Sequence, residues 1–255
     1  MLSERLNEIV ELARQTGRVN VEDLAERFRV TPQTIRKDLN DLCSRRLLAR
    51  THGGAILSSG IENLKYDARR LIASDEKVVI GQVAAAQIPD NASLFINIGT
   101  TTEAVARALL QHTGLMVITN NINVASEMRA YPQIEVIIAG GVVRDSDGGI
   151  VGEAAVDFIR QFKVDFAIIG TSAIDEEGAL LDYDYREVKV AQAIVSNARK
   201  VVLVADATKF ERRAPVRIAH LEQVDIFVTD RCPAAGIRRI CGESEIELLE
   251  TSDRD

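Results

Sequence analysis

The sequence predicts an α/β protein in two parts: a small helical domain that ends in a hairpin, then a larger domain with a mostly parallel sheet. In the first 57 residues, apolar side chains recur at helical spacing, whereas from Ser74 onward apolar strands alternate with amphipathic helices. Such alternation is typical of a parallel sheet covered by helices on both faces. We expect domains over residues 1–57 and 75–255, joined by a linker over 58–74.

The composition is that of an ordinary globular protein, with 255 residues, 46% hydrophobic and 27% charged. The aromatic content of 4% and the lack of Trp argue against a protein that stacks single-stranded bases. No apolar run approaches the roughly 20 residues that span a bilayer, and the charged N-terminus has no signal-peptide core. We therefore expect a cytoplasmic protein with no membrane partner.

Charge is divided unevenly between the two parts. Residues 1–57 hold ten Lys/Arg and eight Asp/Glu, while the remainder holds 21 and 30. Such asymmetry suggests a different partner for each part, because the acidic remainder repels polyanions and leaves the small domain to bind them.

The small domain reads as three helices and a hairpin. The first helix ends near Gly17, the second follows Asn20 as N-cap, and the third begins at Pro32 with Thr31 as its cap. The stretches "LLART" and "HGGAI" then read as two short strands around a Gly-Gly turn. Together these elements predict a winged helix-turn-helix.

The third helix has two distinct faces at 100° per residue. The first face is apolar and should pack on the earlier helices: Ile35, Leu39 and Leu42. The opposite face carries Gln33, Lys37, Asn40 and Ser44, with Arg36 on its flank. Amides and cations of this kind read base edges in the major groove, while the wing, Arg50 to His52, would touch phosphates. The alternative is a helical interaction domain whose basic residues are only solvated.

In the larger domain, each expected element is set by its periodicity and its turn residues. We expect helices over residues 75–88, 101–112, 123–131, 152–162 and 185–198, and strands over 93–98, 115–119, 135–141, 164–170, 200–206, 224–230 and 245–250. In open α/β sheets, ligands bind at the carboxyl ends of the strands.

One such end, "NIGTTTEAV", has the features of an anion site. Gly99 permits close backbone approach, and Thr100 to Thr102 open a helix whose first N–H groups are free. The alternative is a well-capped helix without a ligand. Polar turns at residues 119–121, 139–141 and 170–172 end other strands in the same way, which favours a shared binding edge.

Other chemistries find less support. The three cysteines and three histidines match no metal-ligand spacing, and neither GxGxxG nor a P-loop motif is present. We therefore expect no metal and no cofactor. Charged residues near the later strands (Asp182, Asp184, Glu187, Lys189, Asp206 and Lys209) either bind hydroxyls and phosphate or form surface ion pairs.

The stretch "TPQTIRKDLNDL", followed by "RTHGGA", resembles the DNA-binding signature of the DeoR family of bacterial transcriptional regulators. The resemblance implies DNA contact by the helix-turn-helix from about Asn20 to Leu39. With the helix face above, it gives these DNA-binding candidates: Thr31, Gln33, Thr34, Arg36, Lys37, Asn40, Arg50 and His52.

The larger domain is similar to the sensor domain of the same family, which is akin to the ribose-phosphate isomerase and CoA-transferase fold. In that family the GTT turn binds the phosphate of a phosphorylated sugar or polyol, which implies Gly99, Thr100 and Thr101 as phosphate ligands. Further matching positions are Thr119, Asn120, Asn121, Gly140, Gly141, Glu187, Lys189 and Lys209. Asn97 departs from the acid that the family commonly has before this turn.

The resemblance therefore implies a repressor of operator DNA that a small phosphorylated metabolite releases. Stretches such as "LFINIGTTTEAVARALL" and "DYDYREV" resemble family members that respond to glycerol 3-phosphate, and this resemblance implies glycerol 3-phosphate as the effector. We expect a homodimer or homotetramer, because paired half-sites need paired heads. The alternatives are a phosphosugar isomerase-like enzyme with a helical appendage, a repressor with a different sugar-phosphate effector, and a DNA-binding protein without an effector. Asn97 speaks against the enzyme, since an isomerase needs a carboxylate base.

Overall fold

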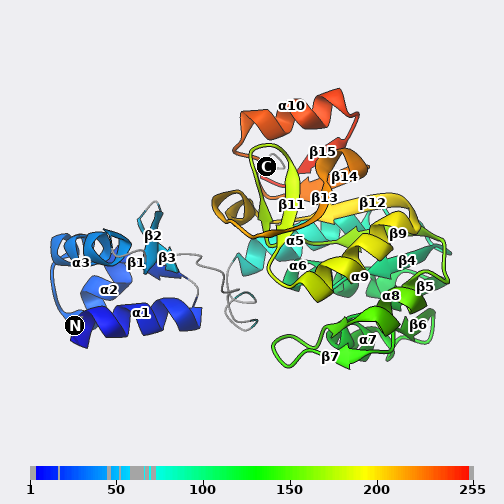
Figure 1. Cartoon of the computed structure of the whole chain (residues 1–255), viewed down its shortest axis with the longest axis horizontal. Helices are drawn as coiled ribbons and strands as arrows, with labels where there is room; N and C mark the ends of the chain where they lie inside the picture. The colour runs from blue at the N-terminus through cyan, green and yellow to red at the C-terminus, as the bar shows by residue number, and fades with distance from the viewer. Residues whose placement is uncertain are drawn as a thin grey trace. The chain divides into compact units, whose positions relative to one another are not determined.

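The computed structural model describes residues 4–16, 18–44, 47–51, 53–57, 66, 69 and 73–252. The chain forms two compact units, residues 1–74 and 75–255 (Figure 1). We call them the head and the sensor unit, and each is described by itself.

Between residues 4 and 57, the described part of the head forms three helices and a small antiparallel sheet. Its elements are α1 (Glu4–Thr16), β1 (Arg18–Asn20), α2 (Val21–Phe28), α3 (Pro32–Ser44), β2 (Leu48–Thr51) and β3 (Gly54–Leu57). The strands pair in the order β1-β3-β2, so the predicted hairpin gains a third strand that the sequence did not suggest. A Cβ on Gly54 would lie 2.0 Å from the carbonyl oxygen of Val19, so glycine is what allows β3 to lie against β1.

The predicted helix caps in the head are confirmed. Asn20 Oδ1 accepts the N–H of Glu22 at 3.0 Å at the start of α2. Thr31 Oγ1 accepts the N–H of Thr34 at 3.2 Å in the first turn of α3. Each cap satisfies an N–H that the helix itself leaves without a partner, which typically stabilises a helix by about 1 kcal/mol.

The head has its own apolar core. Ile9 of α1, Ile35, Leu39 and Leu42 of α3, and Leu48 of β2 are almost completely buried in it. Full burial of such a side chain contributes about 1.5–3 kcal/mol. Because the buried side chains of α3 lie on one face, the opposite face of this helix is left to solvent, as the spacing predicts.

The sensor unit is built on a seven-stranded sheet in the order β15-β14-β12-β9-β4-β5-β6 (Figure 1). All six strand pairings are parallel. The strands are β4 (Ser93–Ile96), β5 (Leu115–Thr119), β6 (Ile134–Ile138), β9 (Val164–Ile169), β12 (Ala198–Val204), β14 (Ile226–Thr229) and β15 (Glu247–Glu250). The predicted mostly parallel α/β architecture is confirmed.

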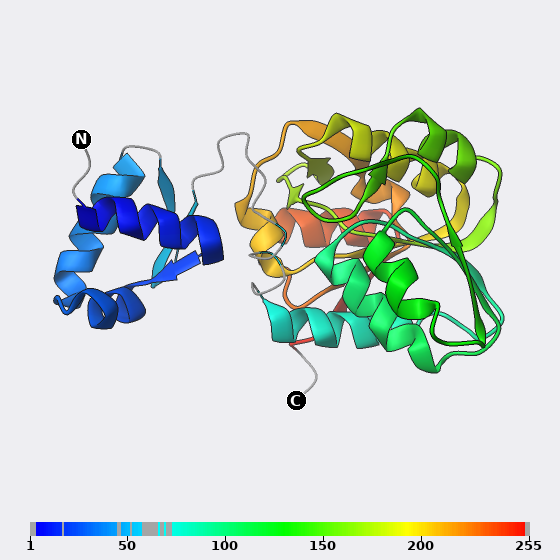
Figure 2. The same ribbon diagram turned by 90° about the horizontal axis from the view of Figure 1, so that it is seen from below.

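Helices cover both faces of this sheet (Figure 2). The helices are α5 (Ser74–Ala85), α6 (Thr100–Ala108), α7 (Ile122–Met128), α8 (Glu153–Ile159), α9 (Tyr185–Ser196) and α10 (Ala235–Glu243), with 3-10 turns η1 (Leu109–Gln111), η2 (Ala207–Glu211) and η3 (Leu221–Gln223). Leu94 and Ile96 of β4 pack with α5, α6 and α7, whereas Phe95 packs with α8 and α9. Successive residues of one strand thus enter two separate cores, as a sheet buried on both faces requires.

The sequence did not suggest α10 or five short strands of the sensor unit. These strands are β7 (Val142–Val143), β8 (Ile150–Val151), β10 (Ala173–Ile174), β11 (Ala179–Asp182) and β13 (Val216–His220). They form a two-stranded arm, β7-β8, and a small antiparallel sheet, β10-β11-β13. Three of them, β7, β8 and β10, have only two residues, which is too short to show a period, so their pairing is set by tertiary contacts. Within the described ranges, no helix combines the length and apolarity needed to cross a membrane.

Candidate functional site

In the head, the outer face of α3 and the hairpin line one hollow of about 740 Å³. Its lining residues are Arg5, Gln33, Thr34, Arg36, Lys37, Asp38, Asn40 and Arg50. The structure thus brings together the α3 residues proposed to read bases and the hairpin arginine proposed to bind phosphate. Thr31 is exposed before the first turn of α3, and its hydroxyl lies 2.9 Å from that of Thr34. His52 lies outside the described residues.

Ion pairs hold charged side chains in place around this hollow. Arg5 of α1 donates to both carboxylate oxygens of Asp38, at 2.7 and 3.2 Å, which neutralises the one acid of the lining. Arg36 lies 3.7 Å from Glu22 of α2 and keeps half of its side chain exposed. Arg5 was not a sequence candidate, because its partner is 33 residues away and no local pattern connects the two. The resulting surface offers amides and cations to a polyanion.

In the sensor unit, polar turns gather at the carboxyl edge of the sheet. The turns after β4, β5, β6, β9 and β12 all lie there because these strands are parallel. Gly170, after β9, lies between its neighbours: a Cβ built on it would be 3.9 Å from the carbonyl oxygens of both Ile98 and Val204. The ends of β4, β9 and β12 therefore adjoin one another.

The turn between β4 and α6 is fixed by one threonine and leaves two others with free hydroxyls in the described part of the chain. Thr102 donates its hydroxyl to the carbonyl oxygens of Asn97 and Gly99, at 2.7 and 2.8 Å, and so fixes the turn. Gly99 has φ 153°, a conformation that favours glycine. Thr100 and Thr101 are 8% and 5% exposed, and neither hydroxyl has a hydrogen-bond partner in the described part of the chain. With the first N–H groups of α6, they can bind an anion.

The Thr-Asn-Asn turn after β5 is mostly occupied by internal bonds. Thr119 donates its hydroxyl to Ile96 at 2.6 Å, and Asn121 caps α7 by accepting the N–H of Asn123 at 2.9 Å. Asn121 also donates to the carboxylate of Glu103 at 3.1 Å. Thr119 and Asn121 therefore position the turn and its neighbours, whereas Oδ1 of Asn120 makes no hydrogen bond to any described residue.

Two buried lysines face the end of β12. Lys209 of η2 is 8% exposed and Lys77 of α5 is 4% exposed, and Nζ of Lys77 lies 4.0 Å from Oδ2 of Asp206. Burial opposes ionisation of Asp206, but Lys209 and Lys77 outweigh it and hold the pKa of this carboxyl below its usual value. Sequence reasoning missed Lys77, because a lysine in the first turn of a helix is usually solvated. Two buried cations at one strand end are suited to balance a phosphate.

Glu187, at the start of α9, belongs to a buried ion-pair cluster. Arg144, from the loop of the β7-β8 arm, lies 2.6 Å from Glu187, 2.6 Å from Asp147 and 3.3 Å from Asp184. Burial disfavours the charged guanidinium, but Glu187 and Asp147 more than compensate, so the pKa of Arg144 is raised. The cluster ties the arm to α9.

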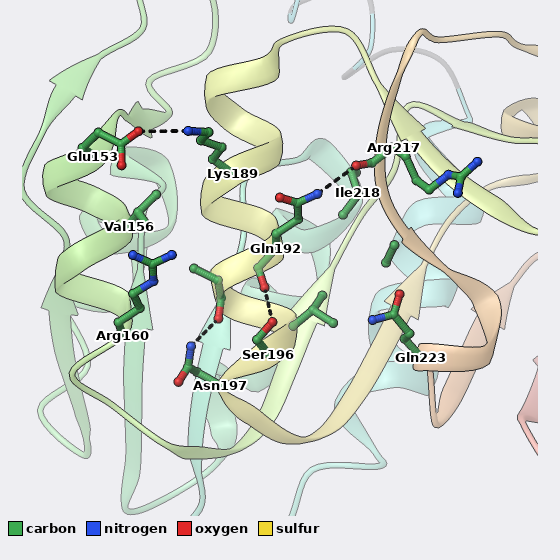
Figure 3. A pocket seen from close by; sticks show the side chains of 13 residues that line it. Glu153, Val156, Arg160, Lys189, Gln192, Ser196, Asn197, Arg217, Ile218 and Gln223 are labelled. Atoms are coloured by element: carbon green, nitrogen blue, oxygen red, sulfur yellow. Dashed lines mark hydrogen bonds and ion pairs between the residues drawn. The ribbon is translucent and has the colours of Figure 1, made fainter.

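Of the remaining effector candidates, Lys189 lies apart from these turns, whereas Gly140 and Gly141 follow β6 at the same edge of the sheet. Lys189 of α9 pairs with Glu153 of α8 at 3.2 Å and lines a separate surface groove of about 650 Å³ (Figure 3). Gly140 and Gly141 are exposed after β6. A Cβ on Gly141 would lie 2.9 Å from Ile150, so this glycine lets β8 approach. The described residues hold no cluster of His, Cys, Asp or Glu suited to bind a metal ion.

Comparison with known families matches both units. The family model of the DeoR-like helix-turn-helix domain matches residues 5–60, and that of the DeoR C terminal sensor domain matches residues 72–231. The chain belongs to the DeoR family. The resemblance read from "TPQTIRKDLNDL" and "RTHGGA" is thereby confirmed.

Its relatives are similar along almost the whole chain. The glycerol-3-phosphate regulon repressor of Escherichia coli (strain K12) is 46% identical, over 96% of this chain and 98% of the relative. The protein of the same name from Haemophilus influenzae is 47% identical, over 97% of this chain and 96% of the relative. The HTH-type transcriptional repressor CsqR of Escherichia coli is 36% identical, over 96% of this chain and 94% of the relative. These relatives are transcriptional repressors.

Among solved structures, the Pyrococcus horikoshii translation initiation factor eIF-2B shares the fold, with a TM-score of 0.50 at 16% identity over 89% of this chain and 95% of that one. Ribose 5 phosphate isomerase A from Neisseria gonorrhoeae has a TM-score of 0.40 at 14% identity over 53% of each chain. At this identity the likeness extends to the fold alone.

Proposed function

We propose that this DeoR-family chain is a repressor that holds operator DNA with its head and releases it when glycerol 3-phosphate binds the sensor unit. The DNA-binding part of this proposal is supported by the hollow of the head, which side chains of α3 and of the hairpin line, and by the family to which both units belong. The effector is supported by two relatives, 46% and 47% identical, that are named glycerol-3-phosphate regulon repressors.

In the head, each candidate has a role that follows from its chemistry. Gln33, Lys37 and Asn40 are exposed on α3 and would reach base edges, since amides and cations pair with them in the major groove. Arg50 of β2 would contact a phosphate and so set the register without reading sequence.

In the sensor unit, the phosphate would lie at the start of α6. The free N–H groups of this helix, the hydroxyls of Thr100 and Thr101, and the positive end of the helix dipole all favour an anion. Lys209 and Lys77 add positive charge from η2 and α5. The observation that carries the proposal is this almost buried pair of threonine hydroxyls, without partners in the described part of the chain, at the start of a nine-residue helix.

We propose that the sensor unit also assembles the repressor as a homodimer or homotetramer. Half-sites of an operator lie one helical turn or a multiple apart, so two heads must be joined by symmetry to bind them together. The effector would then act by population shift, favouring an arrangement of heads that does not match the operator. To move such an equilibrium from 1:99 to 99:1, it must bind the released state about 10⁴-fold more tightly.

The proposal is tested by anisotropy of a labelled operator duplex, selected from random DNA by binding to the full-length protein. Glycerol 3-phosphate should lower operator affinity in a saturable way, and glycerol, which lacks the phosphate, should not. Operator affinity that stays constant up to millimolar glycerol 3-phosphate would remove the effector assignment and leave the DNA-binding assignment standing. Failure to select any duplex would remove both.

A further inference from the structure

Among the residues that the structure describes, three buried side-chain oxygens at the carboxyl edge of the sheet lack a hydrogen-bond partner. They are Oδ1 of Asn97, Oδ1 of Asn120 and Oδ2 of Asp206. These residues are 1%, 0% and 1% exposed. Each follows the end of a parallel strand (β4, β5 and β12), so all three lie on the edge that holds the start of α6.

The surroundings of two of these oxygens fix them as acceptors. Nδ2 of Asn120 donates a hydrogen bond to the carbonyl oxygen of Ile150 at 3.1 Å. This bond fixes the orientation of the amide, so Oδ1 is the atom left to accept a hydrogen bond. Asp206 accepts the N–H of Thr208 with Oδ1 at 3.1 Å, whereas Oδ2 is 4.0 Å from Nζ of Lys77, beyond hydrogen-bond distance. Buried acceptors without donors are rare in folded proteins, so three on one edge indicate that a donor is to be supplied from outside.

The missing donors define the chemistry of the ligand. Hydroxyl groups donate hydrogen bonds, whereas phosphate and carbonyl oxygens only accept them. The same edge offers an anion the start of α6 and the buried Lys77 and Lys209. A matching ligand therefore carries both a phosphate and hydroxyl groups.

We infer that Asn97, Asn120 and Asp206 select phosphate esters that carry hydroxyl donors and reject esters of the same size without them. The inference rests on the proposed function, because it concerns the same effector site. Asn97 is its central residue, since it stands two positions before Gly99 and its carbonyl already holds the phosphate-binding turn through Thr102. The amide of Asn97 can accept a hydrogen bond from a ligand hydroxyl without adding negative charge next to the phosphate.

This selection is measured by calorimetry, as the affinity of the full-length protein for each of three three-carbon phosphates. Glycerol 3-phosphate has two hydroxyls, dihydroxyacetone phosphate replaces one of them with a carbonyl, and propyl phosphate has none. We expect affinity to fall about tenfold with each hydroxyl lost, because the buried acceptor that the hydroxyl would meet is then left without a donor.

Variants assign the selection to Asn97. Asn97→Leu should bind glycerol 3-phosphate about tenfold more weakly and leave propyl phosphate unchanged, since only the hydroxyl contact is lost. Asn97→Asp keeps an acceptor and should keep the order of the three ligands. Asn197→Leu is the matched control, because this amide caps the end of α9 next to the start of β12, at the opposite edge of the sheet. It should leave all three affinities unaltered.

The outcomes separate the two proposals. Propyl phosphate that binds as tightly as glycerol 3-phosphate would overturn the selection, as expected if bound water satisfies the three oxygens, and would leave a phosphate-responsive repressor in place. An unchanged ligand order in Asn97→Leu would overturn the role of Asn97. If no phosphate ester binds, the proposed effector site itself fails. Should Asn97→Leu not fold, the ligand series on the native chain and on Asn97→Asp still decides the question.

Discussion

The head and the sensor unit carry their polar side chains in opposite ways. In the head, Gln33, Lys37 and Asn40 project from α3 into solvent. In the sensor unit, Asn97 and Asp206 are each only 1% exposed. A DNA duplex is too large to be enclosed, so it is bound by exposed side chains on a rigid helix. A small anion can be enclosed, so it is bound by buried polar groups. Under the proposed function, similar residue types would therefore read DNA in one unit and enclose a ligand in the other.

This difference separates the effects of substitution. A change in the head surface removes a contact with DNA but leaves the fold intact, because the scaffold there is the apolar core around Ile35 and Leu39. A change at the carboxyl edge of the sheet in the sensor unit alters buried polar contacts, so it should affect both stability and ligand binding.

The largest expected effect is that of Arg144→Met. The substitution leaves Asp147 and Glu187 buried without their cation, which should lower the free energy of unfolding by about 3–5 kcal/mol. Urea unfolding of the full-length protein measures it. Arg160→Met is the control, since Arg160 pairs with Asp157 at a largely exposed site and should cost less than about 1 kcal/mol. Equal effects of the two substitutions would contradict the contrast between buried and exposed charges.

Lys37→Ala should weaken operator binding by about 1–3 kcal/mol if Lys37 contacts a base. Its side chain is exposed, so the urea midpoint should stay unchanged. Arg27→Ala removes an exposed cation of α2 that does not line the hollow, and operator anisotropy should hardly respond to it. An equal loss in both variants would show that net charge, and not the face of α3, determines binding.

Arg50→Ala should weaken binding to operator and to unrelated DNA alike. One phosphate contact fewer should reduce the slope of log affinity against log salt by about 1. Anisotropy at a series of salt concentrations gives the slope. A loss confined to the operator would assign Arg50 to base recognition instead.

The smallest expected effect is a pH dependence of the sensor unit. Lys209 and Lys77 hold the pKa of Asp206 below its ordinary value of 3.8. The folded state therefore stabilises the carboxylate, and this stability is present above the unfolded pKa and lost as pH falls through the folded one. Asp206→Asn should flatten the decline of stability below about pH 5 in urea titrations. An unchanged profile would show that the two lysines do not stabilise this carboxylate.

The sequence predicted whatever depends on local spacing. The two faces of α3, the caps Asn20 and Thr31, and the threonine turn before α6 follow from residue type and period alone. The partners of buried charges do not, because Arg144 meets Glu187 across 43 positions and Lys77 meets Asp206 across 129. The same limit applies to the Thr-Asn-Asn turn. Its residues look equivalent in sequence, but within the described part of the chain Oδ1 of Asn120 has no hydrogen-bond partner, whereas the side-chain oxygens of Thr119 and Asn121 do.

The central claim is that a phosphate bound at the start of α6 decides whether the head stays on DNA. Operator anisotropy of the native protein and of Thr100→Val/Thr101→Val, each titrated with glycerol 3-phosphate, tests it most directly. The account predicts equal operator affinity without effector, release of the native protein, and no release of the double variant at the same concentration. Release of both proteins at the same concentration of glycerol 3-phosphate would contradict it.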